Sequence, residues 1–257
     1  MGPAPATRTT RGAAAAANEA AAAKTTAGGD ETTTPAASEE QKTEGGGGEG
    51  ENEAGAAPPP DSLIRTENGL QYWSGIDADV NGMLGGFPSI SAVDLRGSRA
   101  FLVKLGIGKS QGLQKVERAL EGGAGIGRIT KGLLLDISQT VDVVEPIAKF
   151  TETLRETPRV GQIYNMGHLT DTQLVSFLRR CRDILSSSSS PSAAIVVKEN
   201  NTTTDADLFD DLDSSVTRTD DKFRALFREA GLRLVRTDLQ NGLPKGLYPV
   251  RMYALKV

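Results

Sequence analysis

Three alternating glycines constrain the fold of this chain more than any other feature of its sequence. Residues 115–128 read KVERALEGGAGIGR, in which Glu121 is followed by Gly123, Gly125 and Gly127. The pattern is typical of a buried strand that ends in a tight turn and continues into a helix. Glycine permits the sharp turn and leaves backbone N–H groups accessible to a ligand beside the helix N-terminus. A glycine turn without a ligand would look similar, so the residues that follow decide between the two interpretations.

A second acidic residue follows the glycines at the distance expected for binding a ribose. The apolar run Val141–Val144 ends in Glu145, 18 residues after Gly127. A carboxylate at the end of a second strand can accept hydrogen bonds from both hydroxyls of an adenosine ribose. The glycine spacing differs from the GxGxxG of NAD-binding folds, because Arg128 occupies the place of the last glycine. We therefore predict a site for S-adenosylmethionine (SAM), with an NAD-dependent oxidoreductase as the weaker alternative.

Composition confines the folded part to one domain. Residues 1–60 contain no Val, Ile, Leu, Phe, Tyr or Trp. They cannot bury enough apolar surface to offset the entropy lost on ordering, so we expect a disordered low-complexity tail. The remaining 197 residues, 61–257, are enough for one domain with a well-buried core.

The acidic charge of the chain is concentrated in the tail. The tail has four basic and nine acidic residues, which give it a net charge of −5. Because the whole chain has a net charge of −4, the domain carries a net charge of +1. A near-neutral domain argues against a nucleic-acid-binding surface, and no apolar run reaches membrane-spanning length. The single cysteine, Cys181, fits a reducing compartment, the cytoplasm or the nucleus. We expect a monomer that binds neither nucleic acid nor membrane and has no metal site.

The order of the apolar patterns predicts a doubly wound α/β domain. The clearest helix, 170–185, repeats apolar residues with helical period from Leu174 to Leu185, and Thr170 or Asp171 can cap its start. The other expected helices span residues 91–105, 126–135, 148–155 and 222–230, and the expected strands after the glycine turn span 141–144, 160–164, 194–197, 232–238 and 247–255.

Two further stretches could serve a binding site or only the packing of the domain. Tyr72 and Trp73 form an aromatic pair that could close over the open end of the sheet or simply anchor an extra helix to the core. The acidic run 205–221 could be a solvated loop. The apolar residues interleaved with Asp210–Asp213, Leu212 among them, favour a partly buried and ordered segment instead.

Several strings of the sequence together resemble the alpha-N-terminal protein methyltransferase family. Besides Tyr72-Trp73 and Lys198-Glu199-Asn200, they are GMLGG (82–86), GAGIGRITK (123–131), GHLTD (167–171), FLRRCR (177–182) and DDLDSS (210–215). The resemblance covers essentially everything after Leu70. It implies a class I SAM-dependent methyltransferase sheet with an N-terminal helical extension. It also implies transfer of methyl groups from SAM to the α-amino group of proteins that begin Xaa-Pro-Lys.

The resemblance implies catalytic roles for three residues. His168 and Asp213 match the positions of a base near the α-amine. The amine must lose a proton before its lone pair can attack the methyl group, and its reference pKa is about 7.7 to 8.0. Asn200 matches the residue that holds the amine through its side-chain amide.

The resemblance also implies two sets of binding residues. The cofactor-binding positions are Gly123, Gly125, Arg128, which would hold the methionine carboxylate, and Glu145, which would hold the ribose. The substrate-binding positions are Trp73, Leu84 and Ile90, which would pack against the substrate proline, and Asp210 and Ser215, with Asp210 and Asp213 attracting the substrate lysine.

Between Tyr164 and His168 the chain departs from the family pattern. The family has roughly two dozen residues there, about one strand with its connections, whereas here residues 165–167 directly precede His168. That segment supplies the fourth strand of the sheet, beside the first, and contacts to adenine. We therefore expect a sheet that lacks this strand. A defective splice or gene-model form, an inactive SAM- or substrate-binding pseudoenzyme, and a sheet in which residues 160–164 replace the strand all remain open.

Overall fold

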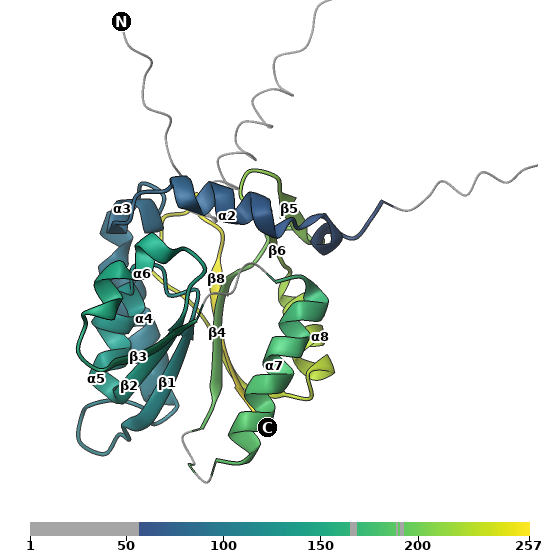
Figure 1. The fold of residues 1–257 in the computed structure, drawn as a ribbon. Helices are drawn as coiled ribbons and strands as arrows, with labels where there is room; N and C mark the ends of the chain where they lie inside the picture. The colour runs from purple at the N-terminus through teal and green to yellow at the C-terminus, as the bar shows by residue number, and fades with distance from the viewer. Residues whose placement is uncertain (1–56, 165–168, 189, 191–192) are drawn as a thin grey trace, which may run out of the picture.

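The computed structural model describes residues 57–164, 169–188, 190 and 193–257. Within them the chain forms two separate sheets and a short hairpin, flanked by helices (Figure 1). Most of the expected tail, residues 1–56, and His168 lie outside the described residues. No described helix is both long and apolar enough to cross a membrane.

The first sheet has three parallel strands in the order β1-β2-β3. They are β1 (Val116–Gly122), β2 (Ser138–Val144) and β3 (Val160–Tyr164). Val141 and Val143 of β2 are fully buried and pack with Leu154. Parallel strands joined through helices are the doubly wound arrangement that the sequence predicts.

The second sheet is antiparallel, in the order β4-β8-β7. Its strands are β4 (Ile195–Asn200), β7 (Arg233–Leu239) and β8 (Val250–Lys256), and the hairpin consists of β5 (Leu208–Asp210) and β6 (Ser215–Thr217). The core of this half centres on the buried Tyr253, whose ring lies 5.7 Å from that of Phe223 and 5.2 Å from that of Phe227. The terminal antiparallel pair predicted from sequence is confirmed as β7 and β8. The second strand was expected from residue 247, but β8 begins only after Pro249, which has no N–H to donate to the neighbouring strand.

Helices cover both halves. The N-terminal extension consists of η1 (Pro60–Leu63), α2 (Thr66–Gly75), α3 (Val80–Met83), η2 (Pro88–Ile90) and α4 (Ser91–Lys104). The remaining helices are η3 (Thr130–Leu134), which is a π-helical turn, α5 (Leu135–Ile137), α6 (Ala148–Arg155), α7 (Asp171–Ser186) and α8 (Asp220–Glu229). In Figure 1, α4, α5 and α6 lie on the side of the first sheet, α7 and α8 lie on the side of the second, and α2 runs across the top of both.

Helix α7 begins where the sequence predicts. The Thr170 hydroxyl accepts a hydrogen bond from the Gln173 N–H at 3.3 Å, and the Gln173 side chain accepts one from the Thr170 N–H at 2.9 Å. This reciprocal capping box satisfies two N–H groups that the helix itself cannot bond. Thr170 rather than Asp171 is therefore the cap.

The strand that the family has beside β1 is absent from the described residues, as expected, and its absence leaves one edge of β1 and one edge of β4 open. Among the described strands β1 pairs only with β2, and β4 pairs only with β8. Central strands of a doubly wound sheet are normally covered on both faces, yet Leu120 on β1 is 50% exposed and Val196 on β4 is 39% exposed. The rearranged-sheet alternative is wrong, because β3 pairs with β2 and leaves the other edge of β1 unfilled.

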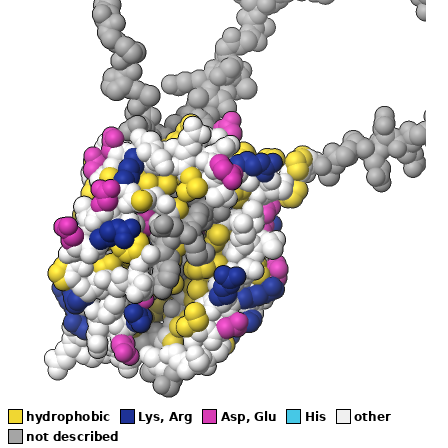
Figure 2. Space-filling view, in the orientation of Figure 1, with side chains coloured by type: hydrophobic (Ala, Val, Ile, Leu, Met, Phe, Trp, Pro, Cys, Tyr) yellow, Lys and Arg dark blue, Asp and Glu magenta, His cyan; other side chains and the backbone are white. Residues whose placement is uncertain are grey.

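Hydrophobic and charged side chains occupy different parts of the surface. On the face shown in Figure 2, hydrophobic side chains lie along the middle, whereas most Lys, Arg, Asp and Glu side chains lie toward the margins.

Replacing Gly127 with alanine is expected to lower the free energy of unfolding by about 2 to 4 kcal/mol. Gly127 has φ +76°, and a Cβ atom there would overlap the Leu154 side chain. Gly112→Ala is the matched control. Gly112 has φ +84°, but a Cβ atom there would meet no atom of the described part of the chain within 4 Å apart from its neighbours, so only the backbone strain of about 1 to 2 kcal/mol remains. Urea denaturation measures both variants, and equal losses would contradict the packing role assigned to Gly127.

Candidate active site

The glycine turn is held by the strand beside it. The N–H of Gly123 donates to the Val144 carbonyl at 2.8 Å. Glu145 is 5% exposed and accepts hydrogen bonds from the N–H of Gly125 at 2.8 Å and of Ile147 at 2.9 Å. Burial raises the pKa of Glu145, and these two N–H donors oppose that rise. The predicted ribose acid therefore also fixes the turn, and each carboxylate oxygen retains acceptor capacity for a hydroxyl.

The space beside the turn fits an approaching cofactor. Gly123 has φ +67°, and among the described residues no atom beyond its chain neighbours lies within 4 Å of the position that a Cβ atom would take. Gly125, in contrast, is buried, and a Cβ atom there would press on the Met83 sulfur at 2.7 Å. The turn is thus closed on the side of Gly125 and open at Gly123. An open glycine turn with a buried acid beside it is the donor and acceptor set that an adenosine cofactor such as SAM requires.

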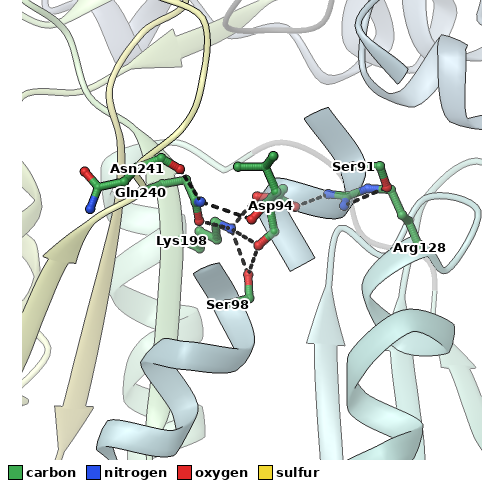
Figure 3. A network of polar contacts seen from close by, with 8 residues as sticks. Ser91, Asp94, Ser98, Arg128, Lys198, Gln240 and Asn241 are labelled. Atoms are coloured by element: carbon green, nitrogen blue, oxygen red, sulfur yellow. Dashed lines mark hydrogen bonds and ion pairs between the residues drawn. The ribbon is translucent and has the colours of Figure 1, made fainter. Parts of the chain in front are cut away.

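Arg128, the predicted partner of the cofactor carboxylate, is held by a residue that sequence reasoning missed. Its Nη2 donates to Asp94 Oδ2 at 2.5 Å, and its Nη1 lies 3.5 Å from the Ser91 hydroxyl (Figure 3). Asp94 is 8% exposed and comes from α4 of the extension. The extension is therefore bound directly to the cofactor turn.

Lys198 binds the same carboxylate from the opposite side. Its Nζ donates to Asp94 Oδ1, to the Ser98 hydroxyl at 2.8 Å and to Gln240 Oε1 at 3.2 Å (Figure 3). Burial alone would raise the pKa of Asp94. The charges and hydrogen bonds of Lys198 and Arg128 outweigh burial and hold the pKa of Asp94 below its ordinary value. A signal for this site was present in the sequence, because Asp94 lies on the same helix face as the buried Phe101, seven residues later.

Glu121, at the end of β1, is a second acid near Arg128 and is half-buried. It accepts a hydrogen bond from the Thr130 hydroxyl. Burial raises its pKa to about 7, against the opposing effects of this hydrogen bond and of the Arg128 charge. A carboxyl with this raised pKa is neutral more often than an ordinary glutamate near pH 7.

We expect Glu121→Gln to remove a pH dependence of stability. A carboxyl with a pKa near 7 in the folded state and 4.5 in its ordinary state binds more protons when folded between these values. The free energy of unfolding should therefore fall by roughly 3 kcal/mol as pH rises from about 4.5 to about 7. The glutamine variant should lack this slope and be the more stable protein at pH 8. Urea denaturation at several pH values measures it, with the exposed Glu117→Gln as control, and parallel curves for wild type and Glu121→Gln would contradict the assignment.

The candidate substrate residues Asp210, Asp213 and Ser215 are brought together by the β5–β6 hairpin. Asp210 and Ser215 are paired across the hairpin and Asp213 lies in its turn. They are 8%, 2% and 0% exposed, so the ordered interpretation of this acidic run is confirmed. The Ser215 hydroxyl has no hydrogen-bond partner among the described residues. The expectation that Leu212 helps to bury this segment is wrong, because its side chain is 52% exposed.

The N-terminal extension covers this hairpin. The Ser214 hydroxyl accepts a hydrogen bond from the Arg65 N–H at 2.7 Å. In Figure 1, η1 and α2 pass over the end of the molecule that holds β5 and β6. This cover explains how three polar side chains of a short hairpin stay away from water.

The proposed wall for the substrate proline comes from three separate elements. Trp73 of α2 packs with Tyr72 in an edge-to-face pair, 5.3 Å between ring centroids, and against a core cluster that contains Ile147. This packing favours the anchoring interpretation of Trp73. Leu84, after α3, is buried, and Ile90, at the end of η2, is half-buried.

Asn200 ends β4, where its backbone pairs with Val250 of β8. The side chain is half-buried. The neighbouring Asn201 is fully buried and donates from Nδ2 to the Tyr253 hydroxyl at 3.1 Å, so it is a structural residue. His168 lies outside the described residues, but the segment after it is anchored, because Arg218 donates to the Leu169 carbonyl at 3.0 Å.

Comparisons with known proteins show the family of this chain. A family described as AdoMet dependent proline di-methyltransferase matches residues 61–167 and 160–256. "Alpha N-terminal protein methyltransferase 1" of Schizosaccharomyces pombe is 39% identical over 213 residues, which cover 72% of this chain and 93% of that protein. "N-terminal Xaa-Pro-Lys N-methyltransferase 1" of Danio rerio is 38% identical over 211 residues, covering 72% and 92%. The solved structure of a SAM-dependent methyltransferase from Leishmania major has a TM-score of 0.64 and 34% identity, covering 74% of this chain and 82% of that one.

The same comparisons locate the missing segment. Of this chain's 257 residues, 72% is about 185, so about 28 of the 213 positions aligned with the Schizosaccharomyces pombe protein have no counterpart here. The two parts of the family match overlap at residues 160–167, which comprise β3 and the three residues after it, before α7. Apart from this break, the match extends from the start of the N-terminal extension to the end of β8. The chain therefore belongs to the family of AdoMet-dependent proline di-methyltransferases, with the class I SAM-dependent methyltransferase fold.

Proposed function

We propose that this chain transfers methyl groups from SAM to the α-amino group of proteins that begin Xaa-Pro-Lys. The Schizosaccharomyces pombe relative is named as an alpha N-terminal protein methyltransferase, and the name of the Danio rerio relative adds the Xaa-Pro-Lys N-terminus. The observation that supports it most within the molecule is the pair of buried carboxylates, Asp210 and Asp213, under the N-terminal extension. Carboxylates shielded from water attract cations more strongly than exposed ones, and the α-ammonium and the lysine of such a substrate are both cationic.

The chain's own residues would divide the work of binding and proton removal. SAM supplies an electrophilic methyl group on a sulfonium when it is bound. Asp213 would accept the proton that the α-ammonium must lose, together with His168. Asn200 would accept a hydrogen bond from the amine through its amide oxygen and so direct the lone pair. Asp210 would attract the lysine at the third substrate position, and Ser215 would offer its hydroxyl to the substrate backbone.

The cofactor would be held by the glycine turn and its neighbours. Gly123 would let it approach the backbone, and Gly125 would support the site through its N–H bond to Glu145. Glu145 would accept from the ribose hydroxyls, and Arg128 would pair with the methionine carboxylate. Trp73, Leu84 and Ile90 would pack against the substrate proline, whose fixed φ reduces the entropy lost on binding.

We further propose that the protein acts as a monomer in the cytoplasm or nucleus, on protein substrates rather than on nucleic acid or membranes. The single cysteine and the near-neutral charge of residues 61–257 support this proposal. Sedimentation of the full chain with and without a substrate peptide tests the monomer.

The deciding experiment measures transfer of labelled methyl groups from SAM to a Ser-Pro-Lys peptide by the full chain. Wild type is expected to methylate the peptide. Asn200→Ala should lower the rate at least about a hundredfold, the usual loss when a positioned hydrogen-bonding group is removed from a reaction centre, while the melting temperature stays unchanged. Gln111→Ala, an exposed amide in the loop before β1, is the control and should keep full activity. A cooperatively folded wild type that binds SAM but transfers nothing would establish the pseudoenzyme alternative.

A further inference from the structure

The network around Asp94 contains more positive than negative charge. One carboxylate lies between Arg128 on Oδ2 and Lys198 on Oδ1. The three side chains are only 12%, 17% and 21% exposed for Asp94, Arg128 and Lys198. The cluster therefore carries a net charge of +1 in a largely buried place. Such an excess charge is costly unless another group compensates it.

A further acid, Glu121, supplies only part of that compensation. Glu121 acts on the charge of Arg128, but its pKa of about 7 leaves it partly neutral at physiological pH, and its carboxylate already accepts from Thr130. A full negative charge brought by a ligand would complete the balance.

The cluster is placed where such a ligand would arrive. Arg128 directly follows the last glycine of the turn, and Lys198 lies on β4, two residues before Asn200. Arg128 also has donors to spare, since a guanidinium has five N–H groups and the contacts to Asp94 and Ser91 occupy two of its nitrogens. Asp94 therefore holds Arg128 in position without exhausting it.

We propose that Lys198 is a positioning residue for the cofactor: it neutralises Asp94, so that Arg128 keeps its positive charge for the carboxylate of SAM. This inference rests on the proposed function. Without Lys198, Asp94 and Arg128 would form a neutral pair. An incoming carboxylate would then meet the uncompensated repulsion of Asp94. Lys198 therefore sets the affinity for the amino-acid end of the cofactor without touching the nucleoside end.

The test compares two ligands by calorimetry. S-adenosylhomocysteine carries the carboxylate, and its decarboxylated analogue keeps the ammonium group but lacks the carboxylate. Lys198→Met is expected to weaken S-adenosylhomocysteine about tenfold, the effect of a unit charge acting over several ångströms in a partly buried site, and to leave the analogue within about twofold of its wild-type affinity. Lys104→Met, which removes an exposed ion pair with Asp238 from the other end of α4, should change neither.

A second set of variants separates this effect from loss of folding. Lys198→Arg keeps the charge and should restore S-adenosylhomocysteine binding. The double variant Asp94→Asn/Lys198→Met removes both charges and should bind S-adenosylhomocysteine more tightly than Lys198→Met alone.

Equal weakening of both ligands in Lys198→Met, or no recovery in the double variant, would overturn the inference. Binding of neither ligand by wild type would overturn it together with the cofactor part of the proposed function. Normal binding by wild type without methyl transfer to the peptide would refute only the proposed activity. The affinities of the Lys198 variants would still decide whether Lys198 positions the cofactor.

Discussion

A chimera that regains a fourth strand is expected to be about 3 to 5 kcal/mol more stable to unfolding than this chain. The chimera carries, between β3 and α7, the corresponding segment of the Schizosaccharomyces pombe relative. A strand of about five residues would bond to the open edges of both β1 and β4, and each hydrogen bond contributes roughly 0.5 to 1.5 kcal/mol net. Covering Leu120 and Val196, now 50% and 39% exposed, adds to this gain, and ordering the inserted residues offsets part of it.

The measurement is urea denaturation of wild type and chimera, with the slope of the transition as a second readout, since it scales with the surface exposed on unfolding. An insert of the same length made of Gly and Ser is the control, because it cannot form a strand readily. Equal stability of the chimera and this control would show that the two sheet edges do not accept a strand. A raised stability together with a higher rate of methyl transfer would show that the missing segment limits this form of the enzyme.

Replacing Asp94 with alanine is expected to lower the free energy of unfolding by about 3 to 5 kcal/mol, because it leaves the charges of Arg128 and Lys198 buried without their partner. Asp136→Ala is the matched control. Asp136 also binds two cations, Arg99 at 2.9 Å and Lys109 at 3.4 Å, but its side chain is 40% exposed. Exposed pairs of this kind are worth about 0 to 1 kcal/mol.

The pH dependence of the two variants provides a further check. The pKa of Asp94 is held below its ordinary value of 3.8, so its contribution to stability is present above that value and is lost as pH falls through the folded-state pKa. The difference between wild type and Asp94→Ala should therefore be full at pH 7 and shrink in acid. Similar losses for Asp94→Ala and Asp136→Ala at pH 7 would show that burial of the network adds nothing.

Local patterns allowed much of the fold to be predicted. The glycine spacing from Gly123 to Gly127 identified the turn after β1, because only glycine readily takes the positive φ angles found at these positions. The apolar period and the cap at Thr170 located α7, since both depend on residues within one or two helical turns. The burial of Asp210 and Asp213 was also expected from their apolar neighbours, although Leu212 turned out to be exposed.

The sequence by itself determined the order of most strands and helices and the glycine turn, because each is encoded in residues close together in the chain. The place where a strand is missing followed from the resemblance to the family, whose pattern the chain leaves between Tyr164 and His168. Only the tertiary structure decided what surrounds the turn. Asp94 meets Arg128 34 residues away and Lys198 104 residues away, and Glu145 reaches back to the N–H of Gly125. Such partners are chosen by burial, since a charge removed from water must bind whatever opposite charge the packing of distant elements brings within reach.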